Sequence, residues 1–333
     1  MKFGPTEKTI VARKYRDKHG KGISTSSLAR LMLKDNPLLF KDFEDARYVL
    51  RYIEGKVGSK KAQYVINSTH YMAEPRNSNP YQLPPSDEIP YITHDLVAKR
   101  VLVLSDIHIP YHSVEALTAT FDFAKKEKPD CILLNGDTLD FFQLSKFVRD
   151  PKKRSFADEL QMFKDFFLVL QKTFPQARIV FKTGNHEMRY ESFLYTRGRE
   201  LVGVDEFVLE NIVKARALGV EFITDKRIIN YHGLNIIHGH EFAGGFFSPV
   251  SPARGLFLRG KTSAIQGHLH QSSEHTEPDM NGKITTTWST GCLCELRPQY
   301  MPINKWNWGF ALIDSADDGF EVRNKRIYKG KVL

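Results

Sequence analysis

Side chains that can bind metal ions recur in five short motifs between residues 106 and 270. In chain order these are Asp106-Ile107-His108, Gly136-Asp137, Gly184-Asn185-His186-Glu187, His238-Gly239-His240 and Gly267-His268-Leu269-His270. Carboxylate, amide and imidazole groups together suit Mn²⁺, Fe, Zn²⁺ or Ni²⁺ better than Ca²⁺ or Mg²⁺. Residues at i and i+2 on extended backbone share a face, so Asp106 with His108, and His268 with His270, can each bind one ion together.

Each motif directly follows an apolar run that predicts a β-strand. The runs are residues 100–104, 131–134, 179–181, 234–237 and 263–265. Because the carboxyl ends of strands in an open α/β sheet converge on one crevice, the motifs are expected to meet there. Helical patterns at 114–127, 156–173 and 205–217 separate the runs, and further strands are predicted beyond residue 283. This order favours a layered sandwich of two sheets.

Each motif alone is weak, but five in one order after five strands are not a chance arrangement. Together they resemble the signature of the calcineurin-like metallophosphoesterases, which reads D-x-H, GD-x-x-D, GNH-D/E, HG or GH, and GH-x-H. This chain has SDIH, GDTLD, GNHE, HGH and GHLH. The resemblance covers roughly residues 99–315 and extends to uncharacterised phosphoesterases of phage and bacterial genomes. It implies an α/β fold, a four-layer β-sandwich flanked by helices.

The resemblance also implies two divalent metal ions, about 3.5–4 Å apart, with Mn²⁺ expected first and Fe, Zn²⁺ or Ni²⁺ as alternatives. The ligands it implies are Asp106, His108 and His270 for the first ion, Asn185, His238 and His268 for the second, and Asp137 bridging both. The family usually uses the histidine before the glycine of HGH, so His240 is expected to support the site or contact substrate.

Two further residues resemble the family's catalytic machinery. His186 matches the histidine that protonates the leaving oxygen. Asp140 matches the residue that orients this histidine in some members, with a helix N-cap as its alternative role. Two ions that share a water lower its pKa, and the resulting hydroxide attacks phosphorus in line without a covalent intermediate. The resemblance therefore implies hydrolysis of phosphate esters.

The substrate is less clearly indicated. The protein Ser/Thr phosphatase branch has an arginine before GNHE and another after GD-x-x-D, where this chain has Lys182-Thr183 and Phe141-Phe142. These differences argue against a phosphoprotein phosphatase. Arg189 either contacts phosphate or caps the following helix. Six aromatic residues either stack on bases or pack in the core: Phe141, Phe142, Tyr190, Tyr195, Trp306 and Trp308.

The charge of the chain is concentrated near its N-terminus. The net charge is +9, and residues 1–64 hold 15 Lys and Arg against 7 Asp and Glu, an excess of +8. Such asymmetry indicates either a segment that meets a polyanion, commonly nucleic acid, or a solvated cationic surface.

The same segment predicts three helices: one near residues 5–19, one that opens after the Ser/Thr cluster at 24–27 and ends at residue 36, and one near residues 42–54. Arg47 and Arg51, at i and i+4, project together from the third. The pattern is typical of a helix-turn-helix unit and also of small bundles that bind no DNA. We therefore divide the chain into a basic helical domain (1–64), a Pro-rich linker or ordered strap (65–97) and a phosphoesterase domain (98–333).

The remaining composition predicts a cytoplasmic protein of a bacterium or a phage-infected cell. No apolar run approaches the roughly 18 residues of a membrane span, and the N-terminus has no apolar signal region. Cys131, Cys292 and Cys294 are too few for a disulfide framework. We interpret the Cys-x-Cys pair as strand packing rather than a zinc site.

These observations favour a dinuclear phosphodiesterase or nuclease that acts on DNA or RNA. The first alternative is a phosphomonoesterase, or a phosphodiesterase for small or cyclic nucleotides. The second is a non-catalytic nucleic-acid-binding protein on a phosphoesterase scaffold. Nucleic acid is the expected partner, and no membrane is expected.

Overall fold

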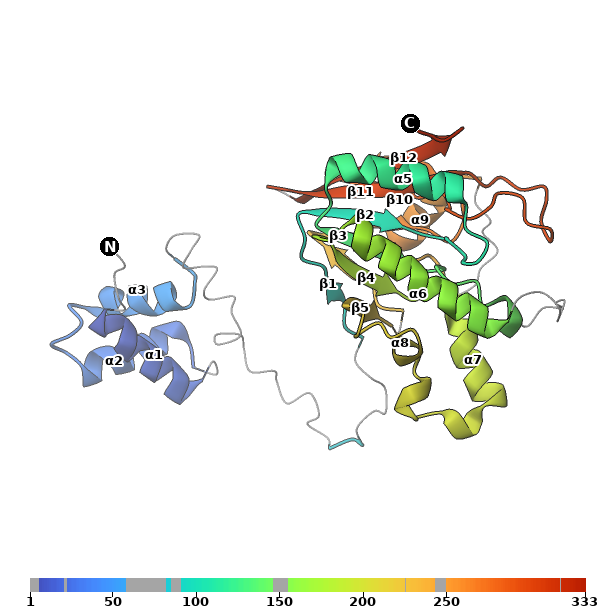
Figure 1. Cartoon of the computed structure of the whole chain (residues 1–333). Coiled ribbons are helices and arrows are strands. Elements are labelled where there is room, and N and C mark those ends of the chain that lie inside the picture. Colours follow the sequence, from blue (N-terminus) through green and yellow to red (C-terminus); the bar gives the residue numbers. More distant parts are fainter. Residues whose placement is uncertain are drawn as a thin grey trace. The chain divides into compact units, whose positions relative to one another are not determined.

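The structure is a computed structural model in which the chain forms two compact units, Met1–Glu88 and Ile89–Leu333 (Figure 1). The residues that it describes are 6–20, 23–57, 82–84, 91–145, 155–224, 226–242, 250–317 and 319–333. Each unit is described by itself. Within the described part of the chain, no helix combines the length and the apolar character needed to cross a bilayer.

The first unit contains the three predicted helices. They are α1 (Glu7–His19), α2 (Thr25–Asp35) and α3 (Phe43–Ile53). Each begins after a residue whose side-chain oxygen accepts a backbone N–H of the first turn, namely Thr6, Ser24 and Asp42. Leu28, Met32, Phe40, Ala46 and Leu50 are almost fully buried among them. The helices therefore pack around a small apolar core of their own.

The second unit is built on two β-sheets. The first sheet has the order β13-β12-β11-β2-β3-β4-β5, and the second has the order β1-β6-β7-β8-β10-β9. The strands of the first are β2 (Arg100–Leu104), β3 (Cys131–Asn135), β4 (Arg178–Lys182), β5 (Val220–Ile223), β11 (Trp308–Ala316), β12 (Gly319–Tyr328) and β13 (Lys331–Val332). Strands β2 to β5 are parallel, whereas β11, β12 and β13 extend the sheet with antiparallel pairing.

The second sheet lies against the first and completes a sandwich. Its strands are β1 (His94–Asp95), β6 (Ile229–Tyr231), β7 (Leu234–Ile236), β8 (Ala264–Gln266), β9 (Ser273–Pro278) and β10 (Ile284–Ser289). Apolar side chains from both sheets form one core between them, including Val103, Leu133, Tyr231, Ile236 and Ile265. The loop after β8 meets the loop after β2, where the backbone N–H of His268 donates to Oδ2 of Asp106 at 2.9 Å.

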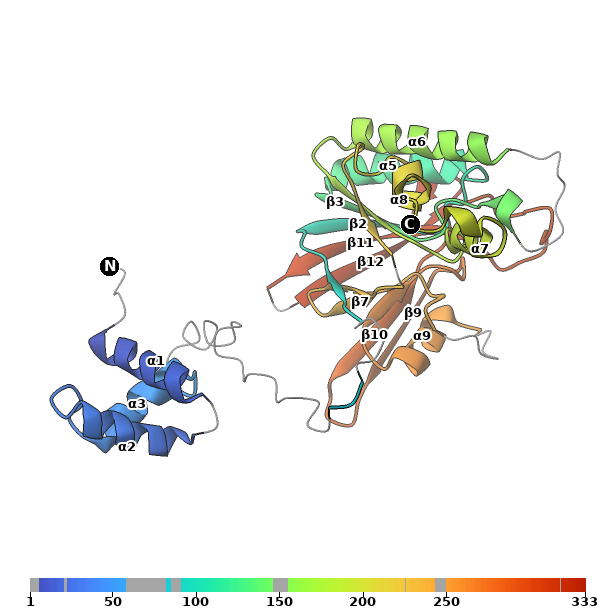
Figure 2. The same cartoon turned by 90° about the horizontal axis from the view of Figure 1, so that it is seen from below.

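Helices cover both outer faces of the sandwich, as Figure 2 shows. α5 (Val114–Glu127) and α6 (Phe156–Thr173) lie over the first sheet, and their apolar faces share a core with it. α9 (Pro252–Gly260) packs on β8, β9 and β10. The four layers confirm the fold expected from the sequence, and α5 and α6 have the predicted bounds.

The prediction of a helix over residues 205–217 is wrong for most of its length. The structure has a 3₁₀ turn at Asp205–Phe207 and a single helical turn, α8 (Leu209–Ile212). Extended backbone at Val208 separates the two, and Lys214 adopts a left-handed conformation that stops further winding. The helix expected after the GNHE motif, for which the sequence gave no bounds, is α7 (Met188–Arg197).

Part of the predicted linker pairs with the second sheet. Strand β1 lies within residues 65–97 and aligns parallel to β6, while Leu96 is 3% exposed in the core between the sheets. The hydroxyl of Tyr91 accepts the backbone N–H of Ile228 at 2.7 Å. Residues 91–97 therefore follow the second sheet as a strap. The predicted linker residues 65–81 and 85–90 lie outside the described residues.

Candidate metal centre

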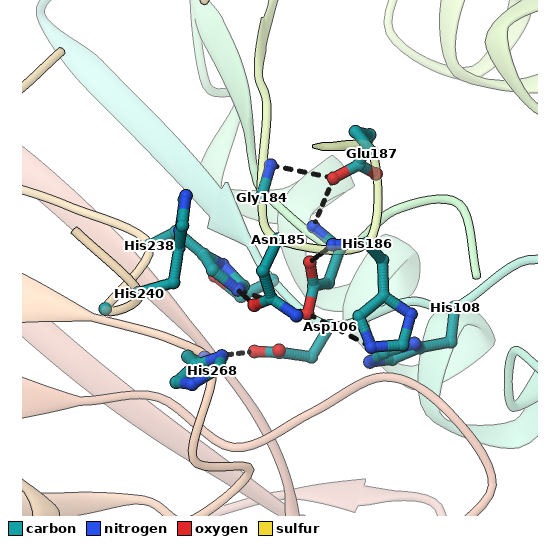
Figure 3. A network of polar contacts seen from close by, with 12 residues as sticks. Asp106, His108, Gly184, Asn185, His186, Glu187, His238, His240 and His268 are labelled. Atoms are coloured by element: carbon teal, nitrogen blue, oxygen red, sulfur yellow. Dashed lines mark hydrogen bonds and ion pairs between the residues drawn. The ribbon is translucent and has the colours of Figure 1, made fainter. Parts of the chain in front are cut away.

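The five motifs come from the ends of strands in both sheets. Asp106 and His108 follow β2, Asp137 follows β3, and Asn185 with His186 follows β4. In the other sheet, His238 follows β7, while His268 and His270 follow β8. The site therefore lies at an edge shared by two sheets, whereas the sequence predicted one crevice of one sheet. Figure 3 shows the side chains of Asp106, His108, Asn185, His186, His238 and His268 gathered at one place.

The predicted ligands of the first ion lie in contact with one another. The Nε2 atom of His270 is 3.1 Å from Oδ1 of Asp106 and 3.3 Å from Nε2 of His108. All three residues are buried. At most one proton fits between two facing imidazole nitrogens, whereas a cation satisfies both lone pairs at once. This donor set therefore fits a divalent ion.

The predicted ligands of the second ion also converge. The Nε2 atom of His238 is 3.2 Å from Oδ2 of Asp137 and 3.2 Å from Oδ1 of Asn185. A ring nitrogen of His268 belongs to the same group, with its ligand atom within 4.8 Å of those of Asp137 and His238. Asp137 also lies in a second such group, with His108. It thus occupies the place expected of a bridging carboxylate.

Backbone strain is concentrated at these residues. Five of the seven predicted ligands have positive φ angles between 51° and 64°: Asp106, His108, Asp137, His268 and His270. The left-handed conformation costs a residue with a side chain on the order of 1–3 kcal/mol. Such strain persists where the surrounding structure imposes it, typically at functional sites.

Two glycines allow the motif loops to approach closely. A Cβ atom at Gly184 would lie 2.3 Å from Oδ1 of Asp137, and one at Gly267 would lie 2.6 Å from Cβ of Ser105. Real Cβ contacts are never this short. Glycine at these positions therefore brings the loops of neighbouring strands within reach of one site.

Comparison with known proteins agrees with this geometry. The sequence profile of the family described as "Calcineurin-like phosphoesterase" matches residues 99–279, which is more than half of the chain. The chain belongs to the calcineurin-like phosphoesterase family. It is 27% identical over 241 residues to the Gene 54 protein of Mycobacterium phage L5, a match that covers 68% of this chain and 92% of that protein.

Two solved structures illustrate the similarity of fold. Zn²⁺-complexed Vps29 from Entamoeba histolytica is 13% identical, with a TM-score of 0.36, over 70% of this chain and 96% of that one. A dimetal phosphatase from Danio rerio is 12% identical, with a TM-score of 0.35, over 71% of this chain and 98% of that one.

Buried carboxylates hold the loops of this phosphoesterase centre in place. Glu187 accepts the backbone N–H groups of Asp137, Leu139 and Gly184 at 3.0, 2.9 and 2.7 Å (Figure 3). One side chain thereby joins the loops that follow β3 and β4. Burial, assisted by the Asp137 carboxylate, raises the pKa of Glu187 to about 6. Glu187 is the last residue of the GNHE motif, but the motif does not indicate that its side chain joins two loops.

A second carboxylate holds the loop that follows β7. Glu241 accepts the backbone N–H of His238 at 2.9 Å and that of Gly239 at 2.6 Å. Its Oε1 lies 2.9 Å from Nζ of Lys182, which is 1% exposed. Burial disfavours the charged form of Glu241, but the Lys182 ammonium outweighs it and lowers the pKa to about 2. Glu241 belongs to none of the five motifs, and its cation Lys182 lies on a strand that is distant in the sequence.

The predicted catalytic pair lies beside the ligands. Nδ1 of His186 is 2.9 Å from the carbonyl oxygen of Asp140 and 3.2 Å from its Oδ1. The same Oδ1 is 3.0 Å from Nδ1 of His108. Phe141, not Asp140, precedes the 3₁₀ turn at Phe142–Leu144, and that turn has no side-chain cap. The geometry therefore favours the orienting role of Asp140 over a helix cap.

Arg189 points at this pair rather than capping a helix end. It lies in the first turn of α7, and its Nη1 donates to the carbonyl oxygen of Asp140 at 2.7 Å. Its Nη2 lies 3.0 Å from Nε2 of His186. The guanidinium is 22% exposed, so it remains accessible beside the catalytic histidine.

Electrostatics favour positive charge at His238 and His270, but not at His108 and His268, whose pKa values burial lowers. Burial disfavours protonated imidazoles, but the carboxylates of Asp137 and Asp106 outweigh it and raise the pKa values of His238 and His270 to about 10. His240 differs, because burial lowers its pKa to about 4. Its ring lies 5.3 Å from that of His238, and both of its nitrogens are buried without a hydrogen bond. His240 thus lines the His238 side of the site.

Several residues expected as substrate contacts lie elsewhere. Phe141 is fully buried and Tyr190 is 4% exposed, so both belong to the core. The indole of Trp308 donates to the carbonyl oxygen of Cys294 at 2.8 Å. Arg47 and Arg51, by contrast, lie on α3 of the first unit, the helix on which the sequence placed them, and Arg47 pairs there with Glu44 at 3.1 Å.

Proposed function

We propose that this protein uses two divalent ions, Mn²⁺ foremost, to hydrolyse phosphodiester bonds of DNA or RNA. Membership of the family already makes it a hydrolase of phosphate esters. The observation that carries the proposal is the convergence of all seven predicted ligands around Asp137, with His186 beside them.

The chain's own residues divide the work of such a reaction. The residues that would hold the ions are Asp106, His108, Asp137, Asn185, His238, His268 and His270. Bound there, two divalent ions supply Lewis acidity that lowers the pKa of water and neutralises charge on the phosphoryl oxygens. The ligands are held by strained backbone and buried carboxylates, so the site needs little reorganisation when substrate binds.

His186 is placed to act as the general acid. Burial disfavours its protonated form, but the carboxylates of Asp137 and Asp140 outweigh burial and raise its pKa. Contacts to Asp140 fix Nδ1, so Nε2 is the nitrogen left to face the leaving oxygen. Nη2 of Arg189 lies 3.0 Å from that nitrogen and can only donate, so the guanidinium has to move onto a phosphate oxygen, to which it is suited, before Nε2 carries the proton to the leaving oxygen.

The cations near the site suit a diester better than a monoester. Lys182, which replaces the arginine of protein phosphatases, is buried and binds Glu241 and the carbonyl oxygen of Arg227. Phe141 replaces the other arginine and lies in the core. A phosphodiester carries one negative charge and a monoester carries up to two. The missing arginines therefore favour the diester.

The first unit supports a nucleic acid as the substrate. On α3, Tyr48 is 56% exposed and Tyr52 is 39% exposed, beside the half-buried Arg47 and Arg51. Arginines bind phosphates, while exposed tyrosines stack on bases. Together with the +8 charge of residues 1–64, this face is suited to a polyanion.

Two assays test the proposal. With Mn²⁺, the purified protein is expected to hydrolyse bis-p-nitrophenyl phosphate faster than p-nitrophenyl phosphate. It is also expected to cleave DNA or RNA, and analysis of the product ends defines the bond broken. The proposal is wrong if the monoester is preferred and nucleic acid stays intact, or if cyclic dinucleotides alone are cleaved.

A further inference from the structure

An aromatic loop lies beside the predicted ligand His270. We call residues 295–307, between β10 and β11, the Trp306 loop. The indole of Trp306 packs on the imidazole of His270, with 4.1 Å between ring centroids and 57° between ring planes. Tyr300 meets the indole nearly edge-on, at 6.5 Å and 65°. The loop thus forms one side of the metal centre.

Hydrogen bonds hold this loop in a defined shape. Nδ2 of Asn304 donates to the carbonyl oxygens of Leu296 and Met301 at 2.7 and 2.9 Å, and its Oδ1 accepts the N–H of Trp306 at 2.9 Å. The backbone N–H of the following residue, Asn307, donates to the carbonyl oxygen of His270 at 3.0 Å. A preformed aromatic surface loses little conformational entropy on binding.

The outer surface of the loop is apolar and exposed. Ile303 is 93% exposed, Tyr300 is 72% exposed and Met301 is 41% exposed. The Tyr300 ring is therefore accessible to a ligand, and it contacts the indole that packs on His270.

Cations flank the aromatic surface. Arg297 and Lys305 are exposed in the same loop, on either side of Tyr300 in the sequence. An accessible ring with cations on either side matches the alternation of base and phosphate in a nucleotide chain. A phosphopeptide would offer no flat face to Tyr300.

We propose that Tyr300 and Trp306 bind an unpaired base next to the scissile phosphate, so that the enzyme acts on single-stranded nucleic acid or unpaired ends. This inference rests on the proposed function. Both faces of a base within a duplex are covered by its neighbours, so only an unpaired nucleotide offers a face to these rings. Arg297 and Lys305 then bind the phosphates on either side.

Binding to fluorescent oligonucleotides tests this inference in the full chain. The measurement uses the His186→Gln variant with Mn²⁺, which keeps every predicted ligand while slowing cleavage. Tyr300→Ala should weaken binding of single-stranded DNA by about 5- to 150-fold, the range for loss of one stacked base. Tyr300→Phe keeps the ring and should bind as before. Tyr195→Ala is the matched control, because Tyr195 is 59% exposed on α7.

A second measurement uses the substrate instead of the protein. An abasic position moved along the single strand should weaken binding at one site next to the cleaved bond. That penalty should disappear in Tyr300→Ala, because the stacking partner is already lost. A fully paired duplex should bind more weakly than the single strand.

Two results overturn the inference. Either Tyr300→Ala binds like Tyr195→Ala, or a blunt duplex is bound and cleaved as well as the single strand. If bis-p-nitrophenyl phosphate is still hydrolysed in those cases, the inference fails while the proposed function stands. If neither that diester nor any nucleic acid is hydrolysed, both fail.

Discussion

At the scale of single residues, the proposed function depends on His186 as the general acid. Its Nδ1 is held by Asp140, and two carboxylates raise its pKa, so it can deliver a proton from Nε2. His186→Gln should lower kcat by about 10²- to 10⁴-fold for a dinucleotide, whose alkoxide leaving group needs that proton. The loss should be much smaller for bis-p-nitrophenyl phosphate, since p-nitrophenolate leaves without protonation.

Steady-state kinetics on the two substrates check this prediction, with bound manganese measured in both proteins. Equal losses for both leaving groups, at unchanged metal content, would contradict the acid role. A drop in metal content would instead assign His186 to the ligands.

At the scale of secondary-structure elements, a buried ion pair joins the end of one strand to the loop after another. Lys182, at the end of β4, pairs with Glu241 at 2.9 Å and so ties it to the loop after β7. Lys182→Met leaves the Glu241 carboxylate buried without its cation. We expect the free energy of unfolding to fall by about 3–5 kcal/mol.

Urea denaturation measures this change, and the double variant Lys182→Met/Glu241→Gln is the matched control. Glutamine removes the unpaired charge and still accepts one of the backbone N–H groups, so stability should partly return. A single variant within 0.5 kcal/mol of the wild type would contradict the predicted tie between the sheets.

The sequence predicted elements well where periodicity is local. The bounds of β2, α5 and α6 were predicted as observed. Their signals, a continuous apolar run for β2 and helical spacing for α5 and α6, lie within each segment. Residues 205–217 show the limit, since Val208 is extended and Lys214 is left-handed within a pattern of helical spacing.

The candidate site was predictable for a different reason. The ligand motifs are short and contiguous, so the sequence alone was enough to predict seven ligands, and the structure brings their side chains together. Their supports were not, because Glu241 meets Lys182 across 59 residues of chain and Tyr300 reaches the site from another loop. The left-handed backbone of Asp106 and His268 could not be predicted either, because neither residue type indicates a positive φ by itself.

At the scale of the whole molecule, the net positive charge is distributed unequally along the chain. Residues 1–64 hold an excess of +8 out of a net +9, whereas the phosphoesterase unit is nearly neutral. If the first unit binds DNA, log Kd should rise with log salt concentration by about 0.9 for each phosphate contact. The double variant Arg47→Ala/Arg51→Ala should lower that slope by about 1.8, the value for two lost phosphate contacts.

The full-length His186→Gln protein is suitable for this titration, with Tyr195→Ala as a surface control. Binding that is independent of salt, or a slope unchanged by the arginine substitutions, would assign the basic charge to a solvated surface. The phosphoesterase assignment would be unaffected.

The central claim is that Asp137 and the six other predicted ligands hold two metal ions. Anomalous X-ray scattering from crystals grown with Mn²⁺ tests it most directly. We predict two peaks, one among Asp106, His108 and His270 and one beside His238 and His268, with Asp137 between them. A single peak, or peaks away from Asp137, would contradict the dinuclear centre.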